Sequence, residues 1–250
     1  MAGVLDGRRS LVCGSSQGIG RACAEELARL GSAVTAVARD ETALRKVVAE
    51  LATVRGSGHH YIIADFADPQ SLQARVSAHV KDVGATHILI NNTGGPPHGA
   101  LVEAKPEQFL QAISNHIVCN QLLVQTLLPG MKAAGYGRIV NIISTSVVAP
   151  IKGLGVSNTT RGAVANWGRT LAGELAPFGI TVNNILPGYT ATARLQSLFQ
   201  AKAEKAGTSV KEIERRTVES IPMGRLASPE EIAAVVGFLA SPGASYLTGV

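Results

Sequence analysis

Short hydrophobic runs alternate with longer amphipathic segments along most of the chain. The short runs have few polar interruptions, which is typical of parallel strands buried on both faces. They lie at 10–13, 33–38, 61–64, 87–91, 138–143 and 181–186. The longer segments repeat apolar residues at helical spacing and are long enough to cross over between parallel strands. They lie at 21–30, 69–83, 108–134, 163–176 and 229–239. This alternation predicts an α/β fold of the Rossmann type, with a doubly wound parallel sheet.

The pattern continues without a Pro/Ser-rich linker, a low-complexity tract or an internal repeat, so residues 1–250 are predicted to form a single domain. One segment, 193–221, departs from the regular rhythm. It is predicted to be an inserted helical pair over the carboxyl ends of the strands, where such folds bind ligands, and so to serve as a substrate lid. It holds six Lys or Arg and four Glu, which also suits an ordinary solvated helix face.

Composition fits one compact core and disfavours a nucleic-acid platform. The 250 residues are 46% hydrophobic and 16% charged, and only 4% are aromatic, so few rings are available to stack on bases. The net charge of +5 affects solubility and encounter rates more than it identifies a partner. We expect no nucleic-acid partner.

The sequence also limits the compartment and the chemistry. Cys13, Cys23 and Cys119 show no C-x-x-C spacing, which favours reduced thiols and a cytoplasmic protein. The N-terminal residues do not resemble a signal peptide, and no apolar run approaches the roughly 18 residues of a membrane span. The six His residues form no ligand-spaced set with Cys or carboxylates, so no metal and no membrane partner are expected.

A glycine-rich loop follows the first predicted strand and opens a helix. It runs Gly14, Ser15, Ser16, Gln17, Gly18, Ile19, Gly20. Without Cβ atoms the backbone can turn sharply and approach a pyrophosphate, whose charge then faces a helix N-terminus. The loop therefore predicts a dinucleotide site.

Further motifs follow the later strands in a fixed order. They are Asp65 and Phe66, then Asn91, Asn92, Thr93 and Gly94, then Ser144, then Pro187, Gly188, Tyr189, Thr190, Ala191 and Thr192. With the glycine loop, this series resembles the short-chain dehydrogenase/reductase family over nearly the whole chain, in particular its 3-oxoacyl-[acyl-carrier-protein] reductase-like branch.

The resemblance implies positions for the cofactor. The glycine loop would hold the pyrophosphate, Asp65 and Phe66 would lie beside the adenine, and the adenosine side would be bordered by Asn91, Thr93 and Gly94. Pro187, Gly188, Thr190 and Thr192 would lie near the nicotinamide. A helix cap at Asp65, a strand-end turn at Asn91 and a loop-breaking Pro187 would suit the same sequence. The family usually has Thr where this chain has Cys13, so a hydroxyl that braces the glycine loop is missing.

Arg39 ends the second strand where an acidic residue would otherwise hold the ribose 2′-hydroxyl. A guanidinium there can pair with a 2′-phosphate, which favours NADP, although a solvated Arg fits as well. Asp40 follows directly and keeps NAD compatible with the sequence.

The catalytic positions depart from the family pattern. The family's Ser falls on Ser144, whereas its Tyr and Lys positions hold Ser157 and Arg161. An aliphatic hydroxyl lacks the phenol pKa of about 10, so Ser157 can donate a hydrogen bond but is a poor base. Arg161 stays protonated, so it can bind ribose or phosphate oxygens without shuttling a proton.

The sequence offers several residues as the proton donor and does not single one out. Ungapped spacing puts His116 at the family's Asn position, while a shift of one residue restores Asn115. His116 could replace the proton donor or be a satisfied helix histidine. Tyr189 and His98 could also reach a substrate if their loops fold over the cleft, or could pack on the surface.

Two functions follow from these residues. One is an oxidoreductase that moves a hydride between the nicotinamide of NADP and a carbonyl or alcohol, in a small molecule or a 3-oxoacyl thioester. The other is a dinucleotide-binding protein that has lost the chemistry and senses cofactor or pairs with a partner. The resemblance also implies a homodimer or homotetramer, in which the helices at 108–134 and 163–176 could pair across a two-fold axis. The apolar faces of these helices could equally belong to the core.

Overall fold

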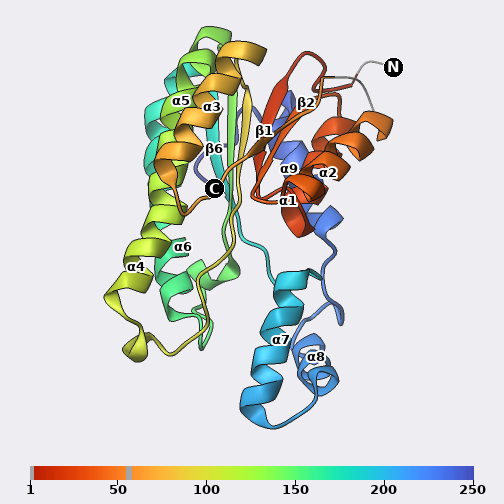
Figure 1. Cartoon of the computed structure of the whole chain (residues 1–250), viewed down its shortest axis with the longest axis vertical. Helices are drawn as coiled ribbons and strands as arrows, with labels where there is room; N and C mark the ends of the chain where they lie inside the picture. Colours follow the sequence, from red (N-terminus) through yellow and green to blue (C-terminus); the bar gives the residue numbers. More distant parts are fainter. Residues whose placement is uncertain (1–2, 55–57) are drawn as a thin grey trace.

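The computed structural model, which describes residues 3–54 and 58–250, contains a six-stranded parallel sheet in the order β3-β2-β1-β4-β5-β6 (Figure 1). The strands are β1 (Arg9–Cys13), β2 (Ala33–Ala38), β3 (His60–Ile63), β4 (Ile88–Asn91), β5 (Gly137–Ile142) and β6 (Ile180–Ile185). Each lies within one residue of its predicted bounds, and the prediction of a doubly wound α/β fold is confirmed.

The strand order reverses between β1 and β4, because β2 and β3 extend the sheet to one side and β5 and β6 to the other. Helices that follow β1 and β4 therefore leave toward opposite faces, and a crevice opens at the carboxyl ends of these strands. On the outer edge of β6, the last residues run alongside the strand, where the Gly249 amide donates to the Val182 carbonyl at 2.8 Å.

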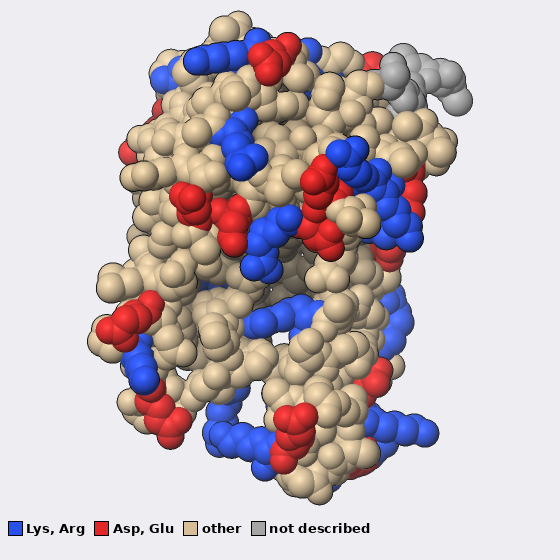
Figure 2. Space-filling model, in the orientation of Figure 1, with Lys and Arg blue, Asp and Glu red and all other residues tan. Residues whose placement is uncertain are grey.

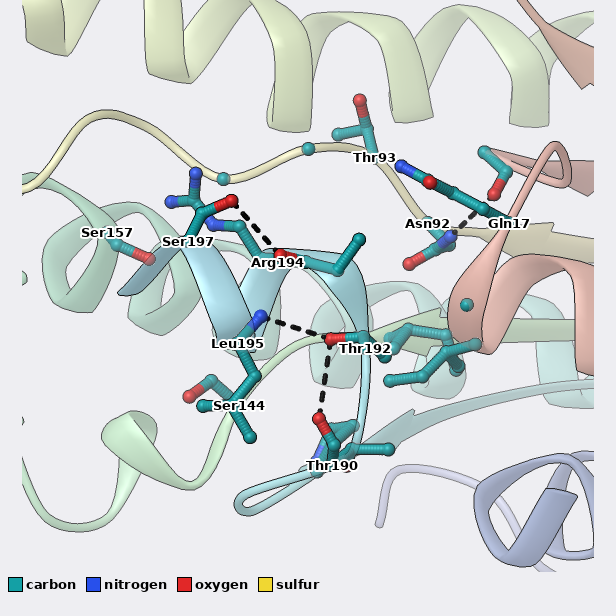
Figure 3. Close-up of a pocket in the computed structure, with 18 of the residues that line it drawn as sticks. Gln17, Asn92, Thr93, Ser144, Ser157, Thr190, Thr192, Arg194, Leu195 and Ser197 are labelled. Carbon is teal, nitrogen blue, oxygen red and sulfur yellow. Dashed lines mark hydrogen bonds between the residues drawn. The ribbon is translucent and has the colours of Figure 1, made fainter. Parts of the chain in front are cut away.

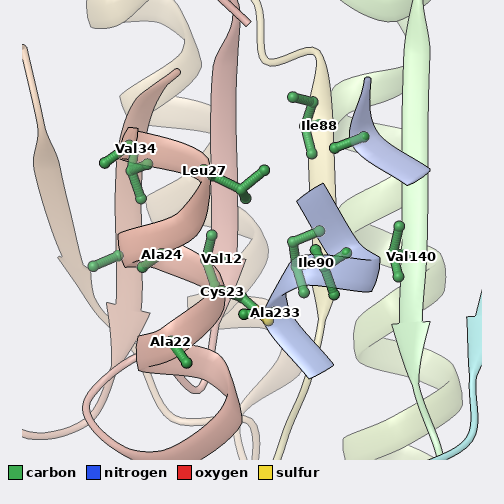
Figure 4. Packing of buried hydrophobic residues seen from close by; sticks show 14 of the residues in the cluster. Val12, Ala22, Cys23, Ala24, Leu27, Val34, Ile88, Ile90, Val140 and Ala233 are labelled. Atoms are coloured by element: carbon green, nitrogen blue, oxygen red, sulfur yellow. The ribbon is translucent and has the colours of Figure 1, made fainter. Parts of the chain in front are cut away.

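One face of the sheet is covered by α1 (Gly18–Arg29), α2 (Glu41–Val54) and α9 (Pro229–Ala240) (Figure 1). Figure 4 shows the aliphatic packing between them and the sheet, where Leu27 and Ala233 lie near Ile88 and Ile90. Helix α2 is the one crossover that has no counterpart among the predicted segments.

The opposite face is covered by α3 (Pro69–Val83), α4 (Pro106–Ile113), α5 (Cys119–Ala134) and α6 (Gly155–Leu175) (Figure 1). The single helix predicted at 108–134 is divided by a π-helical turn, Ser114–Val118. Helix α6 begins eight residues before the predicted segment at 163–176, so it also includes Ser157 and Arg161.

Three distant segments meet around Tyr136 at the amino ends of the strands. The guanidinium carbons of Arg8 and Arg138 lie 3.8 Å and 4.1 Å from the centre of its ring. The Tyr136 hydroxyl donates to the carbonyl of Ala240 at the end of α9. Stacked cations and a buried hydrogen bond thus join this rim of the sheet to the last long helix.

Helices α7 (Ala193–Ala206) and α8 (Val210–Glu219) form an arm that projects beyond the carboxyl ends of the strands (Figure 1). Thr192 caps α7 by accepting the Leu195 amide, and Ser209 caps α8 by accepting the Glu212 amide. The arm's base is tied by the Ala191 amide, which donates to the carbonyl of Ala227. In the described part of the chain, no helix is long and apolar enough to cross a membrane.

Candidate active site

A cavity of about 920 Å³ opens at the carboxyl ends of the strands and continues beneath the first turns of α7. Figure 2 shows this face hollowed between the sheet body and the arm, with Lys and Arg side chains at the border of the hollow. Most of the sequence-predicted site residues line it together: Gly14, Ser16, Gln17, Gly18, Ile19, Arg39, Asp65, Phe66, Thr93, Gly94, Ser144, Ser157, Arg161, Pro187, Gly188, Thr190 and Thr192.

The glycine loop is shaped by very close backbone approaches. Gly14 and Gly18 have φ angles of +61° and +56°, where side chains with a Cβ are disfavoured. A Cβ at Gly20 would stand 2.1 Å from the Gly14 carbonyl oxygen, so Gly20 shapes the loop from behind without lining the cavity. The sequence predicted the loop, and its geometry requires these glycines.

Asn92 holds the start of the glycine loop from the end of the neighbouring strand β4. Its side-chain Nδ2 lies 3.2 Å from the Cys13 carbonyl oxygen and 3.4 Å from that of Gly14 (Figure 3). Its amide group also lines the cavity. The sequence motif contained Asn92, but its role depends on β4 lying beside β1, which the sequence pattern does not reveal.

The start of α1 presents backbone donors to the cavity. Gln17, its N-cap residue, makes no side-chain cap, and Gly18 and Ile19 line the cavity. The first N–H groups of a helix lack intrahelical partners and carry partial positive charge. They form a site suited to a phosphate group.

At the far end of the cavity, Arg39 and Asp65 flank the position expected for adenosine. The Arg39 guanidinium lies 4.0 Å from the Asp65 carboxylate, and the Arg39 side chain is 78% exposed. This loose surface pair leaves guanidinium donors available for a further anion.

The structure does not place Asn91 at this end of the cavity, as the resemblance implied. Asn91 is buried and is absent from the lining. Its side-chain amide donates to Asn141 at 2.9 Å, and the amide of Asn141 donates to Asn184 at 3.0 Å. Asn91 therefore joins β4 to β5 and β6 through a buried amide row, because its side chain points into the sheet packing.

The opposite end of the cavity carries Ser144 and Ser157 (Figure 3). Ser144 follows β5, and its Oγ accepts the amide of Ser146 at 3.1 Å, which leaves its own O–H free to donate. Ser157 lies in the first turn of α6. Two hydroxyl donors therefore face the same end of the cavity.

Arg161 lies one turn further along α6 and is held by backbone carbonyls. Its Nη1 donates to Ile142 at 2.8 Å and its Nη2 to Thr93 at 3.4 Å. Burial, followed by the positive charge of Arg194, lowers its pKa to about 10. Arg161 is therefore protonated at neutral pH and places a fixed positive charge beside the two serines.

His116 does not take the position of proton donor in this structure. It lies in the π-helical turn, is only 2% exposed and does not line the cavity. Burial, then the charge of Arg161, lowers its pKa to about 3, so the ring is neutral at physiological pH. Asn115, the alternative, does line the cavity.

Tyr189 and His98 both line the cavity. The sequence did not decide whether their loops fold over the cleft or pack on the surface. Nδ1 of His98 is enclosed and has no hydrogen-bond partner among the described residues. The lining also includes Arg194 of α7, which the sequence analysis treated as part of a solvated face. Its Nη2 donates to the Pro96 carbonyl at 2.8 Å.

Only part of the predicted lid lines the cavity. The first turns of α7 line the cavity, whereas α8 packs on α7 and contributes no lining residue. Within residues 3–54 and 58–250, no three His, Cys, Asp or Glu side chains meet in a group suited to a metal ion.

The chain is similar in sequence and in fold to many known proteins. The sequence model of a family described as enoyl-(acyl carrier protein) reductase matches residues 14–250. The chain is 34% identical to 3-oxoacyl-[acyl-carrier-protein] reductase FabG of Pseudomonas aeruginosa, over 98% of this chain and 94% of the relative. It is 35% identical to the short-chain reductase protein NovJ of Streptomyces niveus, over 96% and 89%.

The fold also matches solved structures over its full length. The crystal structure of L-sorbose reductase from Gluconobacter frateurii, complexed with NADPH and L-sorbose, superposes with a TM-score of 0.92 at 30% identity. That match covers 100% of this chain and 95% of the other. The similarity therefore includes every element that forms the cavity.

Proposed function

The chain belongs to the short-chain dehydrogenase/reductase family, and on that premise we propose that it is an NADP-dependent oxidoreductase acting on a carbonyl or alcohol. The observation that carries the proposal is one continuous cavity. It joins the donor-rich start of α1 and the basic Arg39 to the two hydroxyls of Ser144 and Ser157.

The residues of the cavity fit NADP. The uncapped first turn of α1 would hold the pyrophosphate, and Arg39 would pair with the 2′-phosphate. Phe66 and Asp65 would flank the adenine, and Pro187, Gly188, Thr190 and Thr192 would border the nicotinamide. The crystal structure of L-sorbose reductase from Gluconobacter frateurii, which is complexed with NADPH, supports this choice of cofactor.

Ser157 and Arg161 are proposed to take the place of the family's Tyr and Lys. The cofactor supplies or accepts a hydride, and the protein must stabilise charge on the substrate oxygen. Ser144 and Ser157 would each donate a hydrogen bond to that oxygen, while protonated Arg161 adds positive potential. Neither serine is a practical base near neutrality, so solvent in the open cavity would supply the proton.

The substrate is a small molecule or a 3-oxoacyl thioester, the second supported by the similarity to FabG. The protein is proposed to act in the cytoplasm as a homodimer or homotetramer. Exposed apolar side chains on the outer helices support an oligomer: Leu110, Ile113 and Val118 are 68%, 42% and 40% exposed.

Titration with NADPH and NADH, followed by nicotinamide fluorescence, tests the cofactor. We expect NADPH to bind more tightly, and the difference to shrink in Arg39→Met because the 2′-phosphate loses its partner. Ketones and 3-oxoacyl thioesters are then added, and oxidation of NADPH is followed by absorbance.

Ser144→Ala tests the chemistry separately. Turnover should fall by roughly 10²–10³-fold, the usual effect of losing one donor to a developing oxyanion, while NADPH affinity stays unchanged. Tight NADPH binding without oxidation of any substrate would instead support the dinucleotide-binding alternative. Failure to bind either nucleotide would refute the proposal.

A further inference from the structure

The substrate end of the cavity carries two positive charges, and the proposed chemistry uses only that of Arg161. Five charged residues line the cavity in the described part of the chain, and Arg39, Asp40 and Asp65 lie together at the adenosine end. The other two are Arg161 and Arg194, so no carboxylate of residues 3–54 or 58–250 lines the substrate end.

The two guanidiniums come from different helices and approach the same glycine. A Cβ on Gly95 would stand 3.3 Å from an Nη of Arg194 and 3.9 Å from an Nη of Arg161. Arg161 projects from α6 and Arg194 from the first turn of α7. Two like charges this close repel each other unless an anion lies between or beside them.

Among the residues that the structure describes, no Asp or Glu forms an ion pair with either guanidinium. The protein acceptors of Arg161 are the Ile142 and Thr93 carbonyls, and that of Arg194 is the Pro96 carbonyl. Each guanidinium has five N–H donors, so several on each remain for a ligand. Elsewhere on the described surface, several arginines, such as Arg215 and Arg225, are paired with glutamates.

His98 adds a neutral donor or acceptor at the same place. Its Nδ1 is enclosed and has no hydrogen-bond partner in the part of the chain that the structure describes, and the positive charges of Arg194 and Lys202 act on the ring. Burial, Arg194 and Lys202 all lower its pKa. The loop that holds His98 is the same one that Arg194 binds at Pro96.

We propose that this end of the cavity binds a carboxylate, and that the natural substrate is an oxo acid or hydroxy acid. The carboxylate would pair with Arg194, with Arg161 supplying further positive potential. The carbonyl or hydroxyl would then face Ser144 and Ser157. This inference rests on the proposed function and names the substrate class for the same site.

Binding to the protein saturated with NADP⁺ tests the inference, because an oxidised cofactor cannot reduce a ketone. Acetoacetate and phenylpyruvate are compared with their methyl esters by isothermal titration calorimetry. The acids should bind roughly 10- to 100-fold more tightly than the esters, the usual range for a charge-assisted hydrogen-bonded pair. The preference should weaken as salt is added.

Arg194→Met should abolish the preference for the acid, and Arg194→Lys should keep part of it. Lys205→Met is the matched control, because it removes one positive charge from the exposed face of the same helix outside the cavity lining. Circular dichroism and the affinity for NADP⁺ check that each variant is folded. If Arg194→Met weakens the binding of NADP⁺ and leaves the ratio of acid to ester affinities unchanged, Arg194 binds the cofactor and the inference is wrong.

The outcomes distinguish this inference from the proposed function. Acid-selective binding that depends on Arg194, without oxidation of NADPH by the same acids, would support the anion site and contradict the reductase. If NADPH is oxidised but acids and esters bind with equal affinity, the reductase is supported and the anion site is overturned. The same conclusion holds if only 3-oxoacyl thioesters oxidise NADPH. If NADP⁺ does not bind, the same acid and ester titrations on the free protein decide the question.

Discussion

His116 shows how burial changes the chemistry of one side chain. The ring is enclosed in the π-helical turn near Arg161, and its pKa is lowered to about 3. The unfolded chain, whose histidines have a pKa near 6.5, therefore binds a proton over a range in which the folded chain does not. Stability linked to His116 is complete above about pH 6.5 and is lost as pH falls toward about pH 3.

His116→Asn tests this linkage, because asparagine keeps a polar side chain but does not titrate. Between about pH 7.5 and about pH 5, the native protein should lose about 2 kcal/mol more unfolding free energy than the variant. Urea unfolding at the two pH values measures the difference. Parallel losses in both proteins would show that His116 is not buried as a neutral ring.

At the residue scale, the location of a side chain could be predicted where it depends on the residue's own motif. Ser144, Arg161 and most of the glycine loop line the cavity, and their roles stay predictions. Location could not be predicted where it depends on packing against another element: Asn91 belongs to a buried amide row, and His116 is enclosed. Asn92 and Arg194 were missed because their partners lie more than 75 residues away in sequence.

The loop between β1 and α1 is shaped by close backbone contacts that would position donors for the cofactor's phosphates. A Cβ at Gly20 would meet the Gly14 carbonyl oxygen at 2.1 Å and Nδ2 of Asn92 at 2.7 Å. Either the helix must move away from the strand or the loop must open. Both movements displace the backbone donors that the phosphate would require.

Gly20→Ala should therefore lower the unfolding free energy by about 1–3 kcal/mol and weaken NADPH binding together with it. Gly173→Ala is the matched control, because this exposed position inside α6 has no heavy atom within 4 Å of an added Cβ. It should gain about 0.5–1 kcal/mol from helix propensity and leave NADPH affinity unchanged. Thermal unfolding and fluorescence titration measure both effects, and equal behaviour of the two variants would contradict the argument.

Strand positions were predictable because buried parallel strands have continuous apolar runs, and β2 matches its run at both ends. Helix bounds were less accurate. Helix α2 buries only Leu44, Val47 and Leu51, a narrow stripe among charged residues. The spacing of apolar residues does not distinguish the π-helical turn from a continuous α-helix, so this turn could not be predicted.

At the scale of the whole molecule, the exposed apolar side chains on the α4 side predict self-association. Leu110, Ile113 and Val118 are solvent-exposed and lie in the segment expected to pair across a two-fold axis. Light scattering should give a mass that is a multiple of the 25.9 kDa protomer. Leu110→Glu should shift the protein toward the protomer, because a carboxylate would be buried at the contact.

Met223→Glu is the control for this experiment. Met223 is 74% exposed and lies beyond α8, away from the outer helices. The oligomer should be unaffected by this change. The proposed surface would be contradicted if the native protein were monomeric at all concentrations. It would also be contradicted if Leu110→Glu and Met223→Glu dissociated the oligomer to the same extent.

The ring of Tyr136, held between Arg8 and Arg138, also constrains the order in which the chain can fold. Its hydroxyl partner, Ala240, lies 104 residues further along the chain. During synthesis, β1 and β5 emerge long before α9, so the rim cannot close until α9 has been made. Early intermediates would expose the apolar surface of α1 that α9 covers, and completion of this core would wait for α9.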